Sequence, residues 1–139
     1  MTMSRQSASA GPDDMKTGKN RYLKLEIFIP EAALPALQAA LQRADAGHIG
    51  NYNSCLSWSP VTSTWRPLEG TNPYIGTAGA LSTETELKAE VTIREAQLAD
   101  VMAAVREVHP YEEPVVNVIP LYCTMMDYLR EGRSLDGSI

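Results

Sequence analysis

Nine side chains in three short segments of the sequence carry groups that could bind a ligand. They supply imidazole, amide, guanidinium, carboxylate and phenol groups: His48, Asn51, Arg66, Glu69, Asn72, Tyr74, His109, Tyr111 and Glu112. A guanidinium forms a planar fork that fits a carboxylate or a phosphate, whereas imidazoles and carboxylates are ligands of metal ions. These residue types predict a binding site for a small molecule, with a divalent metal ion as the possible cofactor.

Catalysis is the less favoured interpretation of the same side chains. Glu112 and Glu113 lie in an extended stretch before a proline, where successive side chains point to opposite sides. That arrangement argues against two carboxylates acting on one bond. Neither the Walker spacing nor a dinucleotide-binding glycine pattern is present. An enzyme would have to assemble its site between subunits, from Arg66, His109 and Glu112.

Several candidate residues also have a structural interpretation. His109 stands at the end of a predicted helix, where a cationic imidazole interacts favourably with the helix C-terminus. Arg66 and Glu69 could pair with each other or with a neighbouring subunit. They lie in a long connection, from about residue 64 to 82, and long connections in small domains are often functional.

Composition excludes several classes of partner. The 139 residues contain 12 Lys+Arg against 17 Asp+Glu, a net charge of −5 that disfavours nucleic-acid binding. No apolar run approaches the roughly 18–20 residues of a membrane span. Two cysteines suit a reducing compartment, and the first residues lack the apolar core of a signal peptide. We therefore expect a cytoplasmic protein with no nucleic-acid and no membrane partner.

The sequence divides into three regions by its hydrophobic pattern. Residues 1–20 have no apolar periodicity and are expected to be a disordered tail. Residues 21–123 form the predicted domain, and residues 124–139 form a C-terminal extension. Apolar residues in the extension predict a short amphipathic helix that must dock on its own subunit or on a partner: Met125, Met126, Tyr128 and Leu129.

An internal repeat predicts the fold. A shift of 64 positions, from Leu23 to Leu87, aligns identical residues at both strand and helix spacing. The first unit reads as a strand over 22–29, a helix over 31–46 and strands over 54–59 and 64–66 around a turn at Pro60–Ser63. The second unit ends in a strand over 115–121. Two such units predict an α+β, ferredoxin-like split βαβ fold, with an antiparallel sheet, two helices on one face and an extra hairpin.

The segments between these elements resemble a known family. In chain order they are Gly47–Tyr52, Cys55, Arg66–Gly70, Asn72–Gly76 and His109–Pro114. This series is similar to the domain inserted within the YqfO-like, Nif-three-like dimetal proteins, over about residues 21–121. The last segment also resembles the CutA divalent-cation tolerance proteins.

The resemblance implies a binding or regulatory role. Similarity to CutA and to the PII signalling proteins implies a ferredoxin-like subunit that assembles as a homotrimer with clefts between subunits. The dimetal family holds its metals in domains that flank the insertion and that are absent from this sequence, so its metal chemistry does not transfer. A ligand- or metal-responsive module is therefore expected, and an inter-subunit enzyme or a pure assembly domain remain the alternatives.

Two geometric expectations follow from the repeat. Apolar residues occur on both faces of the predicted strands, and Tyr22 and Phe28 lie on the face opposite the main apolar set. The second face of the sheet should therefore be buried in an oligomer. The turn Gly47–Tyr52, the loop Arg66–Gly76 and the segment His109–Glu113 should converge on one site, because the first and last of these are equivalent exits from the two helices.

Overall fold

A computed structural model describes residues 21–130 of the chain. The predicted disorder of residues 1–20 lies outside the described residues, as does the end of the C-terminal extension. The elements in chain order are β1 (Tyr22–Ile29), η3 (Glu31–Ala33), α1 (Leu34–Arg43), β2 (Ser57–Trp65), β3 (Ser82–Arg94), η4 (Glu95–Gln97), α2 (Leu98–Val108), β4 (Val116–Pro120) and α3 (Met125–Arg130).

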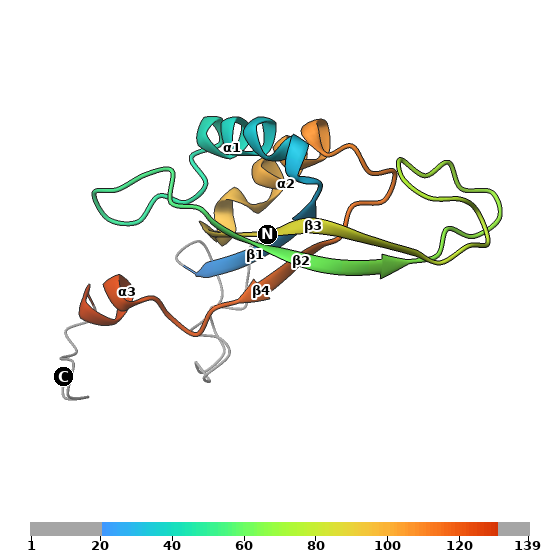
Figure 1. Cartoon of the computed structure of the whole chain (residues 1–139). Coiled ribbons are helices and arrows are strands. Elements are labelled where there is room, and N and C mark those ends of the chain that lie inside the picture. The colour runs from blue at the N-terminus through green and yellow to red at the C-terminus, as the bar shows by residue number, and fades with distance from the viewer. Residues whose placement is uncertain (1–20, 131–139) are drawn as a thin grey trace, which may run out of the picture.

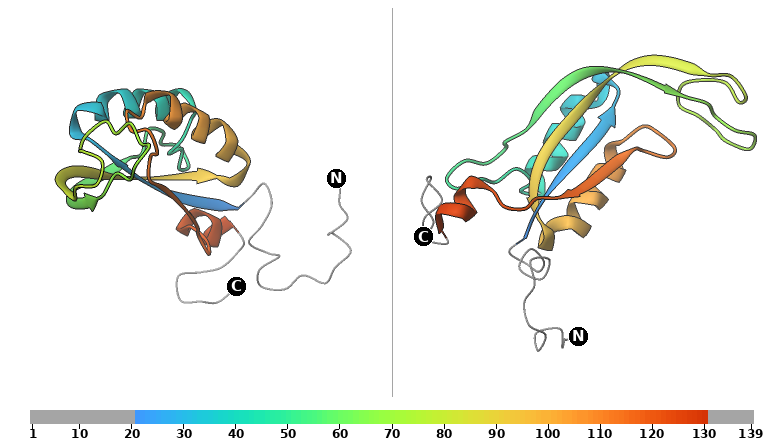
Figure 2. Two further views of the ribbon diagram at one scale, coloured as in Figure 1. Left: turned by 90° about the vertical axis from the view of Figure 1, so that its right-hand side faces the viewer. Right: turned by 90° about the horizontal axis from the view of Figure 1, so that it is seen from below.

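The sheet has four antiparallel strands in the order β2-β3-β1-β4. Both α1 and α2 cover one face of this sheet, and α3 lies at one end of it (Figures 1 and 2). The two repeat units therefore interlock, since β1 and β3 pair at the centre. The predicted α+β ferredoxin-like fold is confirmed.

Buried and partly exposed residues alternate along the central strands, and the buried ones form the core between the sheet and the helices. In β1 every second residue is buried, from Leu23 to Ile29. The buried face meets an apolar stripe on each helix, contributed by Leu37 and Leu41 of α1 and by Val101 and Val105 of α2. Burial of this shared face is the main stabilising contribution that the fold makes.

The opposite face of the sheet is charged at its centre, which corrects the expectation of an apolar second face. Lys24 lies 2.5 Å from Glu90, and Lys88 lies 3.6 Å from Glu26 and 3.8 Å from Glu90. The register places Glu26 directly opposite Glu90. The two carboxylates would repel each other, so Lys88 between them stabilises the pairing.

The predicted turn at Pro60–Ser63 is wrong, because β2 runs without interruption through these residues. β2 is an outer strand of the sheet, and proline is tolerated in outer strands because its missing N–H leaves no ladder bond broken. The hairpin is instead formed by β2 and β3, and residues 66–81 connect them at the far end (Figure 1).

Helix α1 ends at Arg43, earlier than the predicted residue 46. The chain then adopts positive φ angles at Asp45 (57°) and Gly47 (83°), which end the helix. Among residues 21–130, no helix combines the length and the apolar character needed to cross a membrane.

Candidate functional site

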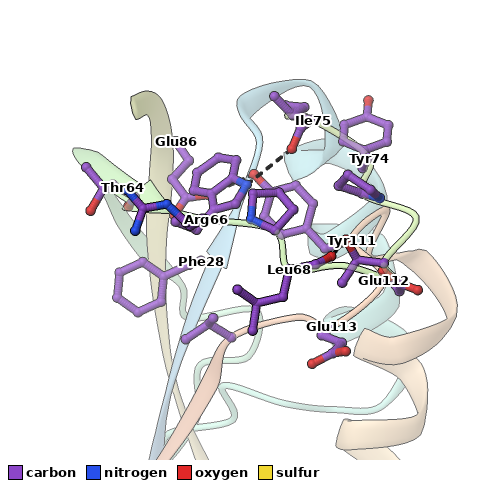
Figure 3. A pocket seen from close by; sticks show the side chains of 16 residues that line it. Phe28, Thr64, Arg66, Leu68, Tyr74, Ile75, Glu86, Tyr111, Glu112 and Glu113 are labelled. Atoms are coloured by element: carbon purple, nitrogen blue, oxygen red, sulfur yellow. Dashed lines mark hydrogen bonds between the residues drawn. The ribbon is translucent and has the colours of Figure 1, made fainter. Parts of the chain in front are cut away.

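A cavity of about 520 Å³ lies where the 66–81 connection meets the segment that follows α2. Figure 3 shows the side chains that line it. Four are aromatic, namely Phe28, Trp65, Tyr74 and Tyr111. Four are charged, namely Arg66, Glu86, Glu112 and Glu113. Aliphatic residues and prolines, among them Leu68, Pro73, Ile75 and Val115, supply much of the remaining wall.

Hydrogen bonds hold the 66–81 connection against the rest of the cavity. The indole N–H of Trp65 donates to the Ile75 carbonyl at 3.2 Å. The backbone N–H of Asn72 donates to the Glu112 carboxylate at 3.0 Å, which joins this connection to the segment after α2. The rings of Trp65 and Tyr74 lie 6.0 and 5.9 Å from the Tyr111 ring. The cavity is therefore formed within one chain.

Glu86 is a buried carboxylate in the cavity wall. Its residue is 4% exposed, and the Tyr111 hydroxyl donates to Glu86 Oε2 at 2.8 Å. Burial raises the pKa of the Tyr111 phenol, and the bond to Glu86 raises that pKa further. Tyr111 therefore remains protonated at neutral pH and acts as a donor.

His109 is buried beside Tyr111, with their ring centroids 4.8 Å apart, and both of its ring nitrogens are hydrogen-bonded. Nε2 donates to the Phe28 carbonyl at 2.6 Å, and Nδ1 accepts the Tyr111 backbone N–H at 3.2 Å. Because a carbonyl only accepts and a backbone N–H only donates, these partners select the neutral imidazole with its proton on Nε2. The expected cationic role at the helix C-terminus is therefore wrong, although His109 does directly follow α2 and has a structural role.

The pKa of His109 lies below its usual value, first because burial disfavours the charged form and also because Arg106 lies nearby. The hydrogen bond to the Phe28 carbonyl and the negative charge of Glu86 oppose this shift. Between the unfolded and folded pKa values, the unfolded chain binds a proton that the folded chain does not. This contribution to stability is therefore complete above a pH of about 6.5 and is lost as the pH falls below that value.

We expect the His109→Gln variant to remove this pH dependence, because glutamine keeps an N–H donor for the Phe28 carbonyl but does not titrate. The measurement is urea denaturation at about pH 7 and at about pH 5.5, on either side of the usual histidine pKa. An equal slope in the parent and in His109→Gln would contradict the assignment.

The structure brings four of the nine predicted residues to the cavity wall: Arg66, Tyr74, Tyr111 and Glu112. Asn72 reaches the same place through its backbone N–H. Glu69 is exposed on the connection and does not line the cavity. Arg66 makes no ion pair with Glu69 or with any other residue in the range 21–130.

His48 and Asn51 lie at the opposite end of the sheet, so the expected convergence of all three segments is wrong in this part. The 47–56 loop and the 66–81 connection extend from opposite ends in Figure 1, and Figure 2 agrees. β1 and β3 are antiparallel, so the helices that follow them end at opposite ends of the sheet. His48 instead contacts the Asp45 carboxylate at 3.0 Å and the Gly50 carbonyl at 3.1 Å.

Glu112 and Glu113 both line the cavity, so the two carboxylates do reach one site, contrary to the expectation from an extended stretch. The segment after α2 consists of bends and is not an extended strand. Phe28, Trp65 and Glu86 were absent from the predicted site. Trp65 had a signal in the sequence, since it directly precedes Arg66, whereas Phe28 and Glu86 look like ordinary strand residues.

A divalent metal ion has no evident set of ligands in the described part of the chain. Residues 21–130 contain no group of three or more His, Cys, Asp or Glu side chains arranged to hold a metal ion. His109 is unsuitable as a ligand because both of its ring nitrogens are already bonded. The residues at the cavity therefore do not fit a metal centre within one chain.

Comparison with protein families gives one matching model. Residues 69–130 match the model of the CutA1 divalent ion tolerance protein. This match includes most of the 66–81 connection, the whole of α2 and the segment that follows it. It therefore covers most of the two segments that meet at the cavity.

Curated relatives share more sequence with this chain. A protein of Halalkalibacterium halodurans named GTP cyclohydrolase 1 type 2 homolog is 48% identical over 98 residues, which are 70% of this chain and 26% of that protein. The protein of the same name from Mycobacterium tuberculosis is 38% identical over 99 residues, again 70% of this chain and 26% of the relative. The chain thus spans about a quarter of the length of these relatives.

Solved structures of a NIF3-related protein and of a CutA protein have the same fold as this chain. A Bacillus cereus protein related to NIF3 has a TM-score of 0.66 and 34% identity, covering 76% of this chain and 27% of that one. The periplasmic divalent cation tolerance protein CutA from Archaeoglobus fulgidus has a TM-score of 0.59 and 19% identity, covering 78% of this chain and 92% of that one. The predicted resemblance to CutA and to Nif-three-like proteins is confirmed.

Proposed function

We propose that this chain, a small CutA/PII-type module related to the CutA1 family and to a segment of the NIF3-related proteins, binds a small organic molecule and works as a regulatory subunit. The observation that carries this proposal is the cavity at the junction of the 66–81 connection and the segment after α2. Its volume of about 520 Å³ falls within the range of small-molecule sites, roughly 300–1,000 Å³. The module comprises residues 21–123, and 124–139 extend it.

The cavity has the composition typical of a binding site. Aromatic and aliphatic side chains form most of its wall, and a few polar groups converge on it. In residues 21–130, none of the serine and threonine hydroxyls that line the cavity is hydrogen-bonded to a basic side chain, the phenol of Tyr111 stays protonated, and His109 is held as a buried donor and acceptor. Binding is therefore better supported than catalysis. An enzyme that assembles its site between subunits is the second candidate function.

We further propose that the module assembles as a homotrimer. β2 and β4 are outer strands, so each has one side with no strand partner in residues 21–130, and a second copy can pair there. Exposed apolar side chains would be covered in the same step, including Trp58 on β2, Val118 and Ile119 on β4, and Met125 and Leu129 on α3. The resemblance to CutA and PII proteins favours three copies, and a cytoplasmic location suits the two free cysteines.

Light scattering coupled to gel filtration tests the assembly. The expected mass at micromolar protein concentration is three times 15.2 kDa. The Ile119→Lys and Met125→Lys variants, which place a charge on exposed apolar positions, should shift the mass toward a monomer. A mass equal to one chain for the parent would contradict the homotrimer.

A thermal-shift screen tests ligand binding. A ligand that binds only the folded state raises the melting temperature, because it adds its binding free energy to the free energy of unfolding. The panels are amines, carboxylates, nucleotides and divalent metal ions. We expect a stabilising compound among the organic panels. Stabilisation by metal ions alone would support a metal-responsive module, and no stabilisation in any panel would support a pure assembly domain.

A further inference from the structure

The charged groups around the cavity indicate which class of ligand it takes. Three carboxylates, Glu86, Glu112 and Glu113, and one guanidinium, Arg66, line the cavity, so the formal charge of the wall is −2 (one positive and three negative groups). We propose that the cavity binds an organic ammonium ion carried on an apolar body. This inference rests on the proposed ligand-binding function and narrows the ligand to one chemical class.

Glu86 is the strongest support for a cationic ligand. It is 4% exposed, and its recorded hydrogen bond is the one from the neutral Tyr111 hydroxyl. In residues 21–130, no lysine, arginine or histidine forms an ion pair with it. A buried carboxylate without a counter-ion is costly. An ammonium group in the cavity would supply the missing positive charge.

The aromatic side chains support the same class. The rings of Trp65 and Tyr74 flank the Tyr111 ring at 6.0 and 5.9 Å, and Phe28 lies elsewhere in the same wall (Figure 3). The face of an aromatic ring carries negative potential and attracts ammonium ions more than neutral groups of the same shape. The rings also provide the apolar surface against which the body of the ligand would pack.

Arg66 is the group that favours the opposite class, a carboxylate or a phosphate. Its side chain is exposed, whereas Glu86 is buried. Water screens the charge of an exposed group much more than that of a buried group. The field inside the cavity is therefore set by Glu86 more than by Arg66, because Glu112 and Glu113 are exposed and are screened as Arg66 is.

Three probes that differ only at the end of their chain test this inference on the full-length protein. They are 2-phenylethylamine, which is a cation at neutral pH, 2-phenylethanol, which is neutral, and 3-phenylpropanoate, which is an anion. Isothermal titration calorimetry gives the dissociation constant of each. We expect the amine to bind about tenfold or more tightly than either of the others, with affinity falling as salt is added.

Variants of residues in the cavity wall test separately how charge and how aromatic packing contribute to amine binding. Glu113→Gln should weaken amine binding by about threefold, because it removes one carboxylate and leaves the shape intact. Glu69→Gln, on the same connection but outside the cavity, should bind as the parent does. Tyr74→Leu should weaken amine binding by about threefold, because it removes one aromatic ring from the wall. Circular dichroism confirms that each variant is folded.

The results distinguish this inference from the proposed function. If the alcohol or the propanoate binds as tightly as the amine, or if Glu113→Gln and Tyr74→Leu leave amine binding unchanged, the cation inference is wrong and the ligand-binding function stands. If none of the three probes binds but a carboxylate or nucleotide raises the melting temperature, the inference is again wrong and the function stands. If nothing binds in any panel, both are wrong.

Discussion

The Gly47→Ala variant is expected to lose roughly 2–5 kcal/mol of unfolding free energy, from backbone strain and a steric clash together. Gly47 has a φ of +83°, and a Cβ atom there would lie 2.3 Å from the Cys55 carbonyl oxygen. The backbone cannot move away without breaking two hydrogen bonds, from the Gly47 N–H to Thr92 and from the Cys55 N–H to Gly47, each 3.0 Å long. Urea denaturation of both proteins measures the loss.

Gly79→Ala is the matched control for this variant. Gly79 has the same φ of +83°, but a Cβ atom there would meet nothing within 4 Å. It should therefore show only the conformational cost, about 1–2 kcal/mol. Equal losses in the two variants would mean that the contact with Cys55 relaxes freely, and would contradict the account of Gly47 as a close-packed point between α1 and β2.

The second large effect is expected from Tyr111→Phe. Removing the hydroxyl leaves the buried Glu86 carboxylate without its recorded donor. The loss of a hydrogen bond to a charged buried group costs about 2–3 kcal/mol. Tyr74→Phe is the control, because Tyr74 is exposed and its hydroxyl has no recorded partner in residues 21–130. That control should change the free energy of unfolding by less than about 0.5 kcal/mol.

A double variant tests the physical reason for the Tyr111 effect. In Tyr111→Phe with Glu86→Gln, the buried group left without its donor is neutral, so the penalty should be at least halved relative to Tyr111→Phe in the parent background. The free energies of unfolding of the four proteins give the coupling. An additive result would show that the hydroxyl stabilises the protein independently of Glu86.

The repeat made the fold predictable from the sequence, because it preserved strand and helix spacing in phase across both units. The sequence predicted a turn at Pro60–Ser63 because proline is a strong turn signal. A proline can stand within β2 only because β2 is an outer strand. The position of a strand within a sheet is a tertiary property. It does not appear in the local pattern around Pro60.

The candidate site was only partly predictable. The repeat makes the turn Gly47–Tyr52 and the segment His109–Glu113 equivalent exits from the two helices, but antiparallel pairing of the two units places equivalent positions at opposite ends of the sheet. Glu86 was missed because it shares one strand face with Glu84, Lys88 and Glu90, and a row of charged residues is typical of a solvated face. Its burial depends on Tyr111 and the 66–81 connection, which are distant in the sequence.

The fluorescence of Trp65 tests most directly the claim that the cavity is the ligand site. The chain has two tryptophans, and Trp65 lines the cavity whereas Trp58 does not. The Trp58→Phe variant therefore leaves Trp65 as the reporter. Each compound that raises the melting temperature in the screen is titrated into this variant, and its dissociation constant is measured separately by calorimetry. We expect a saturable change in Trp65 emission with the calorimetric dissociation constant, whereas calorimetric binding without any change in that emission would place the ligand elsewhere and contradict the account.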